Sequence, residues 1–138
     1  MEITLAQLNE AGKSVFPGLV GVEIDDVADG VVHAKLPLRD EHMAPNGYLH
    51  AAAVIALADT ACGYGCILSL PEGGIGFTTI ELKTNFLATA LDGEIAATAT
   101  LAHGGRTTQV WDAVVTTTAT GKTIAMFRCT QLVLYPPD

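Results

Sequence analysis

The stretch HAAAVIALADTACGYGCIL, residues 50–68, decides the fold. Its residues are small and apolar at almost every position, so a helix formed by it has no polar face and must be buried on nearly every side. Its length also reaches that of a membrane span, roughly 18 residues. Because an acid, Asp59, lies at its middle among alanines and two glycines, we expect the central helix of a soluble domain and not a membrane span.

Strand patterns lie on both sides of this helix. The β-branched and often alternating segments are residues 20–27, 31–38, 77–87, 94–103, 107–118 and 122–135. Short glycine-containing turns join most of them, which predicts hairpin-linked, antiparallel strands. A short helix is expected over Thr4–Phe16, capped by Thr4 with Gln7 and ended by Pro17. The sequence therefore predicts a single α+β domain over residues 1–138, with an antiparallel sheet wrapped around the long helix.

The composition of the chain limits the kinds of partner that we expect. Charged residues make up 16% of the chain, below the usual share of about 25%, which favours a homo-oligomer that hides apolar surface. The net charge of −8 argues against a nucleic-acid partner. Cys62, Cys66 and Cys129 have no metal-ligand spacing, so we expect buried thiols, no metal site and a reducing compartment. Because the first residues also lack a signal-peptide pattern, we expect a cytoplasmic protein.

Asp59 is the first candidate for chemistry. An unpaired buried carboxylate costs several kcal/mol, and no cation lies three or four residues from it in the helix. Its partner is then either a group elsewhere in the fold or a substrate, for which Asp59 would act as nucleophile or general base. His50 begins the helix and is expected to hold either the helix start or the substrate. The N–H groups of Ala51 and Ala52 are expected to be free to polarise a carbonyl.

Helix geometry places the Ala51 N–H and the Asp59 carboxylate far apart. Ala51 and Asp59 are eight residues apart, or about 12 Å along the axis. A nucleophile and an oxyanion donor must both lie about 3 Å from the reacting centre. One copy of the helix cannot supply both, so the sequence predicts a site between two subunits.

The stretch from His42 to Cys66 resembles the signature of hotdog-fold thioesterases of the phenylacetate-pathway and 4-hydroxybenzoyl-CoA type. Pro45, Gly47, His50 and the triplet Leu57-Ala58-Asp59 stand in matching places. The later segments TTIELKTNFL, GRTTQVWDAVV and GKTIAMFRCTQLVL are similar to strands of that family, in the same order. The resemblance covers nearly the whole chain.

This resemblance implies a hotdog fold and an acyl-CoA thioesterase for small or medium acyl groups, aromatic ones included. Subunits would join edge to edge and dimers would pair into a tetramer. Asp59 would be the nucleophile or base, the Ala51 N–H would polarise the thioester carbonyl, and Thr79 or Thr78 would help to place water. It implies no cofactor beyond the CoA of the substrate.

The resemblance also implies cationic contacts to the CoA phosphates, for which Arg106 and Lys83 are the candidates. The sequence departs from the family at three positions. Ala51 and Ala52 replace two glycines, and Ala44 replaces an Asn or Gln for which Asn46 is the expected substitute. These departures leave room for a different or bulkier acyl group, or for decayed activity. Two other functions stay open: an acyl-CoA-binding protein that is catalytically weak, and an acyl-thioester hydratase or dehydratase, which is a second enzyme class on this fold.

Overall fold

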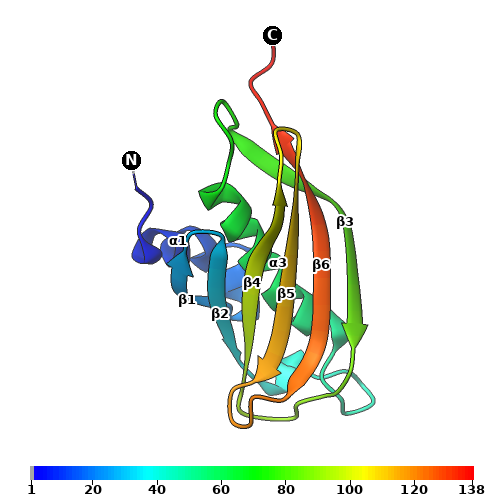
Figure 1. Cartoon of the computed structure of the whole chain (residues 1–138). Helices are drawn as coiled ribbons and strands as arrows, with labels where there is room; N and C mark the ends of the chain where they lie inside the picture. Colours follow the sequence, from blue (N-terminus) through cyan, green and yellow to red (C-terminus); the bar gives the residue numbers. More distant parts are fainter. Residues whose placement is uncertain (1) are drawn as a thin grey trace.

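The computed structural model describes residues 2–138, and Figure 1 shows their path. Its helices are α1 (Leu5–Lys13), α2 (Phe16–Val20) and α3 (Ala51–Leu68), with a 3₁₀ turn at Asp40–His42. Its strands are β1 (Glu23–Ala28), β2 (Val31–Pro37), β3 (Gly76–Phe86), β4 (Glu94–Gly104), β5 (Thr108–Thr117) and β6 (Thr123–Leu134). The six strands form one antiparallel sheet in the order β1-β2-β4-β5-β6-β3.

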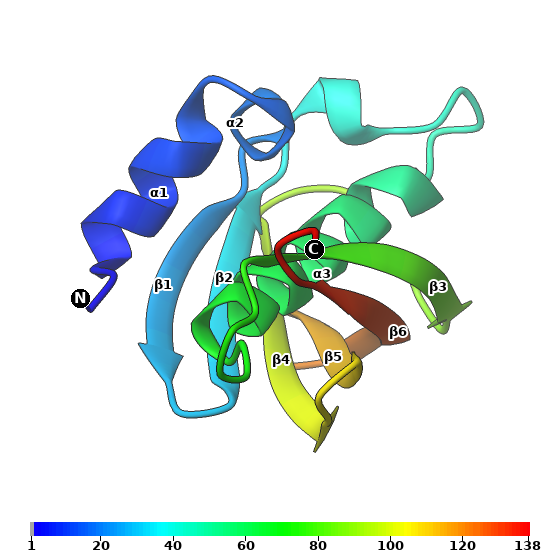
Figure 2. The ribbon, with the colours of Figure 1, turned by 90° about the horizontal axis from the view of Figure 1, so that it is seen from above.

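The sheet curves around α3, as the view from above shows (Figure 2). Leu57, Ala58 and Ala61 of α3 are completely buried against it. The predicted α+β architecture, a hotdog fold with a long central helix, is therefore confirmed. The helix is long and apolar enough to cross a membrane, but 56% of it is buried and it is the core helix of a soluble protein.

The N-terminal part differs from the sequence expectation in two places. The expected helix Thr4–Phe16 ends at Lys13, because Pro17 lies in the first turn of the separate helix α2, a position that suits proline. The expected strand over residues 20–27 begins only at Glu23, since Val20 is the last residue of α2. The predicted capping box of Thr4 is confirmed.

The two edges of the sheet are covered differently. At β1, the side chain of Asn9 on α1 pairs with the backbone of Ile24 like a neighbouring strand, accepting from its N–H at 2.8 Å and donating to its carbonyl at 2.9 Å. At the other end β3 is an edge strand, and it exposes Ile80, Leu82 and Phe86 by 56%, 41% and 46%. One edge is thus closed by the chain itself, whereas the other presents apolar side chains beside a free strand edge.

Tight packing fixes α3 against β5. A Cβ added to Gly65 would lie 2.4 Å from the ring of Trp111, which is completely buried. The Trp111 indole N–H donates to the Gln109 side-chain oxygen at 2.8 Å, and the Gln109 amide donates to the Ser69 carbonyl at 2.9 Å. The end of α3 is therefore held by a ring that only glycine can accommodate and by a buried polar chain.

We predict that Gly65→Ala lowers the free energy of unfolding by about 1–3 kcal/mol, because the methyl group overpacks the Trp111 ring. At an unconstrained helix position the same change stabilises by about 1 kcal/mol. Urea unfolding at fixed protein concentration measures the difference. The control is Gly76→Ala, where an added Cβ meets nothing within 4 Å and we expect a change below about 0.5 kcal/mol. Equal stabilities of the two variants would contradict the packing.

Candidate active site

Asp59 lies on the face of α3 that points towards β3. Gly63, one helical turn further on the same face, packs against Phe77 of β3. The Oδ1 atom of Asp59 is buried and makes no hydrogen bond within residues 2–138. Burial raises the pKa of the Asp59 carboxyl above its ordinary value. A buried carboxylate oxygen without a partner in one protomer is available to a water molecule or a substrate.

His50 is the N-cap of α3. Its Nδ1 accepts a hydrogen bond from the Ala52 N–H at 2.9 Å, and its carbonyl accepts one from the Ala53 N–H at 3.0 Å. The expectation that the Ala52 N–H is free is therefore wrong, since the imidazole occupies it. Because Nδ1 is an acceptor, the neutral ring carries its proton on Nε2.

The Ala51 N–H is the donor that remains at the helix start. No acceptor for it occurs in the part of the chain that the structure describes. It lies at the positive end of the α3 dipole, where a carbonyl oxygen that gains negative charge is stabilised. Asp59 lies eight residues further along the same helix, about 12 Å away, so both groups are available but not to one reacting atom in one protomer.

Thr79 and Thr78 lie on opposite faces of β3. Thr79 pairs with Gln131, which is completely buried, and its hydroxyl donates to the Gln131 side-chain oxygen at 2.7 Å. Thr78 pairs with Leu132, whose side chain is exposed on the outer face. Of the two candidates, only Thr79 points to the side of α3. Because its hydroxyl hydrogen is engaged in the bond to Gln131, the Thr79 oxygen can act only as a hydrogen-bond acceptor for another group.

Gln131 is a polar residue of this region that our sequence analysis did not identify. Its amide nitrogen lies 3.4 Å from the Cys129 sulfur, two residues earlier in β6. The neighbouring Cys129 thiol and burial together raise the pKa of the Cys62 thiol on α3. The alternation of inward-facing and outward-facing residues in β6 was the signal that could have identified Gln131, because residues two apart in a strand point to the same face.

Asn46 lies at the tip of the loop before α3, and it is exposed. Its side-chain oxygen accepts from the Tyr48 N–H at 3.2 Å, and the Ala44 N–H donates to the Tyr48 carbonyl at 2.7 Å. The Asn46 side chain thus stabilises its own turn.

Arg106 and Lys83 do not form one patch. Arg106 is exposed in the β4–β5 turn, next to Thr107, whose carbonyl accepts from the Val133 N–H. Val133 pairs with Phe77 at the start of β3, whereas Lys83 lies six residues further along that strand, roughly 20 Å at about 3.3 Å per residue. Lys83 pairs with Arg128 on the sheet face that points away from α3.

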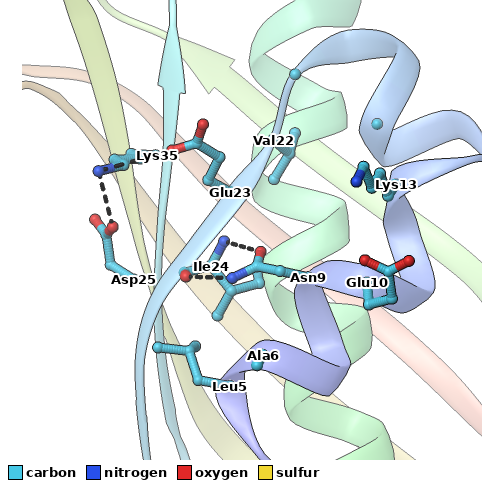
Figure 3. Close-up of a pocket in the computed structure, with 12 residues that line it drawn as sticks. Leu5, Ala6, Asn9, Glu10, Lys13, Val22, Glu23, Ile24, Asp25 and Lys35 are labelled. Carbon is cyan, nitrogen blue, oxygen red and sulfur yellow. Dashed lines mark hydrogen bonds and ion pairs between the residues drawn. The ribbon is translucent and has the colours of Figure 1, made fainter.

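A groove of about 720 Å³ lies elsewhere, between α1 and β1 (Figure 3). Asn9 in this groove is bonded to Ile24, and the Lys35 ammonium lies 3.2 Å from an Asp25 carboxylate oxygen. Asn9, Lys35 and Asp25 are therefore each paired within the protein, whereas the Asp59 oxygen is both buried and without a partner.

The remaining sulfur and acid groups form no ligand cluster. Cys62, Cys66 and Cys129 are buried and free. Over residues 2–138, His, Cys, Asp and Glu side chains do not gather in groups of three or more that could hold a metal ion.

Known proteins resemble this chain over most of its length. The Thioesterase superfamily profile matches residues 46–129. A 1,4-dihydroxy-2-naphthoyl-CoA hydrolase of Listeria monocytogenes is 34% identical over 111 residues, which are 80% of this chain and 89% of that protein. A proofreading thioesterase of Klebsiella pneumoniae is 29% identical over 83% of this chain and 82% of its own length.

A crystal structure of a thioesterase from Haemophilus influenzae superposes with a TM-score of 0.90 at 28% identity, covering 98% of this chain and 93% of that one. The matched region contains the whole of α3, the buried carboxylate and the strand that faces it. The chain therefore belongs to the thioesterase superfamily and is a thioester hydrolase, an acyl-CoA thioesterase of the hotdog fold.

Proposed function

We propose that Asp59 carries out the hydrolysis of the acyl-CoA thioester, as nucleophile or as general base for water. The observation that supports this is the buried Asp59 oxygen without a partner, on the face of α3 next to β3. Water supplies OH to the acyl carbon and a proton to the sulfur, so the products are a carboxylic acid and the CoA thiol. A base takes the proton from water directly, whereas a nucleophile first forms an anhydride that water then opens.

The second group of the proposed site is the Ala51 N–H of another subunit. It would donate to the thioester oxygen as negative charge develops there, while the same subunit's own Asp59 lies too far away. His50 fixes this N–H in place as the N-cap. Thr79 would accept a hydrogen bond from the attacking water, and Asn46 would support the loop that leads into α3.

The difference between the two sheet edges supports one way in which two subunits would join. Because α1 closes the β1 edge through Asn9, the exposed β3 edge with Ile80 and Leu82 is the one free to pair with a second copy. Two β3 strands that pair antiparallel would bring two α3 helices side by side in opposite directions, with Ala51 of one near Asp59 of the other. The outer face of the sheet, which exposes Met126 by 54%, would pair two such dimers into a tetramer.

The substrate of the proposal is a small or medium acyl-CoA, and aromatic acyl groups are included. The named activities of the relatives, on 1,4-dihydroxy-2-naphthoyl-CoA and in proofreading, are consistent with this range. Arg106 and Lys83 are the proposed CoA phosphate contacts, and their separation means that they serve different parts of the assembly. An acyl-CoA substrate and three free thiols are consistent with a cytoplasmic location.

The first prediction for the proposed site concerns turnover. Asp59→Asn keeps the shape of the side chain and removes its charge, so we expect kcat to fall by at least ~10²-fold while acyl-CoA binding survives. A thiol-release assay and calorimetric binding measure the two effects. Binding by the wild-type protein without thiol release would favour a binding protein, and water addition to a crotonyl thioester without thiol release would favour a hydratase. A folded variant with wild-type turnover would remove Asp59 from the mechanism.

The second prediction concerns stability and pH. Because burial raises the folded-state pKa of Asp59, the unfolded chain loses this proton first, and the carboxyl destabilises the fold as pH rises above its ordinary value of 3.8. We therefore expect Asp59→Asn to be more stable than wild type near neutral pH, and the advantage to shrink on acidification towards that value. Urea unfolding at several pH values measures it.

The control for this prediction is Asp112→Asn, for which the opposite sign is expected. The Arg128 side chain hydrogen-bonds to Asp112 and lowers its pKa below the ordinary value. Its carboxylate therefore stabilises the fold above the ordinary pKa, and this stabilisation is lost as pH falls through the lowered value. If Asp59→Asn lost stability at neutral pH as Asp112→Asn should, Asp59 would be a structural acid with a partner.

The third prediction tests the two-subunit site. Ala51→Pro removes the free N–H, and the chain accepts proline here because Ala51 is the first helical residue and His50 has an extended ψ of 134°. We expect a folded protein with kcat reduced by about 10²–10³-fold, the effect of removing one oxyanion donor.

Mixed assemblies then decide which subunit supplies which group. A dimer of one Ala51→Pro subunit and one Asp59→Asn subunit has one intact site if the groups come from different subunits, and none if they come from the same subunit. Refolding the two inactive variants together in equal amounts should recover about a quarter of wild-type activity by random pairing. No recovery, with mixed dimers verified by mass spectrometry, would place the site within one subunit.

A further inference from the structure

The face of α3 that carries Asp59 has no side chain one turn further along, at Gly63. The ring of Phe77 from β3 fills this space instead. A Cβ added to Gly63 would lie 3.0 Å from the Phe77 Cζ and 3.7 Å from its Cε2, so the ring already rests on the helix backbone. Because β3 is an edge strand, this ring closes the space between α3 and the edge of the sheet at the level of Gly63.

The distance between this contact and the reacting centre is short. Asp59 and Gly63 are four residues apart, or about 6 Å along the axis. Since the thioester carbon must come within about 3 Å of the Asp59 carboxylate, an acyl group that continues along this face meets the Phe77 ring after a few atoms. Phe77 is half-buried and packed against the hydrophobic core, which resists displacement of the ring.

Two other positions of α3 at the level of Gly63 are covered by the sheet. Next to Gly63, the buried Cys62 faces β6 and Gly65 is covered by Trp111. Within one protomer, the face that joins Asp59 and Gly63 is therefore an apolar route that α3 offers to an acyl group.

We propose that Phe77 is a specificity-determining residue, whose ring against Gly63 closes the acyl site about one helical turn beyond Asp59 and limits the substrate to compact acyl groups. This inference rests on the proposed function of Asp59. We therefore expect short aliphatic and compact aromatic acyl groups, naphthoyl included, to be accepted, and long aliphatic chains to be excluded.

The test is an acyl-chain profile of wild type, Phe77→Ala and Phe77→Leu. The substrates are the CoA esters of acetate, butyrate, hexanoate, benzoate, 2-naphthoate and dodecanoate. Wild type should favour the compact esters. In Phe77→Ala the ratio of kcat/KM for dodecanoyl-CoA to that for butyryl-CoA should rise by at least about tenfold, the lower end of what a hydrophobic pocket discriminates per missing group. Phe77→Leu should shift the ratio less.

Two further variants make the test specific. Ile75→Ala truncates an apolar residue that is 64% exposed just before β3, and it should leave the profile unchanged. The double variant Gly63→Leu/Phe77→Ala fills the same space from the helix side and should restore the wild-type order of substrates. If Phe77→Ala does not fold, the less disruptive Phe77→Leu decides with the same ratio.

Failure of this proposal is distinguishable from failure of the proposed function. If wild type releases no thiol from any ester, the proposed catalytic role of Asp59 is wrong. The proposed size limit is then tested by calorimetric binding of the same esters to wild type and Phe77→Leu. A folded Phe77→Ala protein with the wild-type order of substrates would overturn the role of Phe77. So would a shifted profile that Ile75→Ala shares.

Discussion

The burial of α3 is the constraint on which the rest of the structure depends. A helix with no polar face must be covered on nearly every side, and a curved antiparallel sheet provides that cover with one continuous surface. The same burial removes water from Asp59 and raises its pKa. Asp59 also lies on the face of α3 next to β3, so the desolvated carboxylate lies beside an edge strand of the sheet.

The architecture could be predicted from sequence because its determinants are local patterns. Helix and strand periods, turn glycines and the capping box of Thr4 each specify their own element. Asp59 could be proposed as a site residue because an acid in an apolar helix is costly to bury without a partner, and the structure shows a buried Asp59 oxygen without one. The separation of Ala51 and Asp59 along one helix followed from helix geometry alone, and the structure leaves these two groups unpaired within one protomer.

Features that depend on side chains meeting across elements could not be predicted. Asn9 looks like an ordinary polar helix residue until Ile24 is seen to lie beside it. Whether the Ala52 N–H is free depends on the rotamer of His50, which the sequence does not specify. The contact of Phe77 with Gly63 likewise needs the register of β3 against α3, which no local pattern contains.

The contacts at the start of α3 explain in physical terms what the departures from the family signature would do. Compared with the family signature that the sequence resembles, alanines stand in place of glycines at positions 51 and 52, and alanine favours helix formation over glycine by about 1 kcal/mol. Their methyl groups also reduce the space beside the free Ala51 N–H. The His50 cap fixes the direction of that N–H, since the cap occupies its neighbour. The site that we propose would then be narrow at both ends, at the alanine methyls near the carbonyl oxygen and at the Phe77 ring beyond Asp59. A site of this shape would exclude long aliphatic acyl chains by steric overlap.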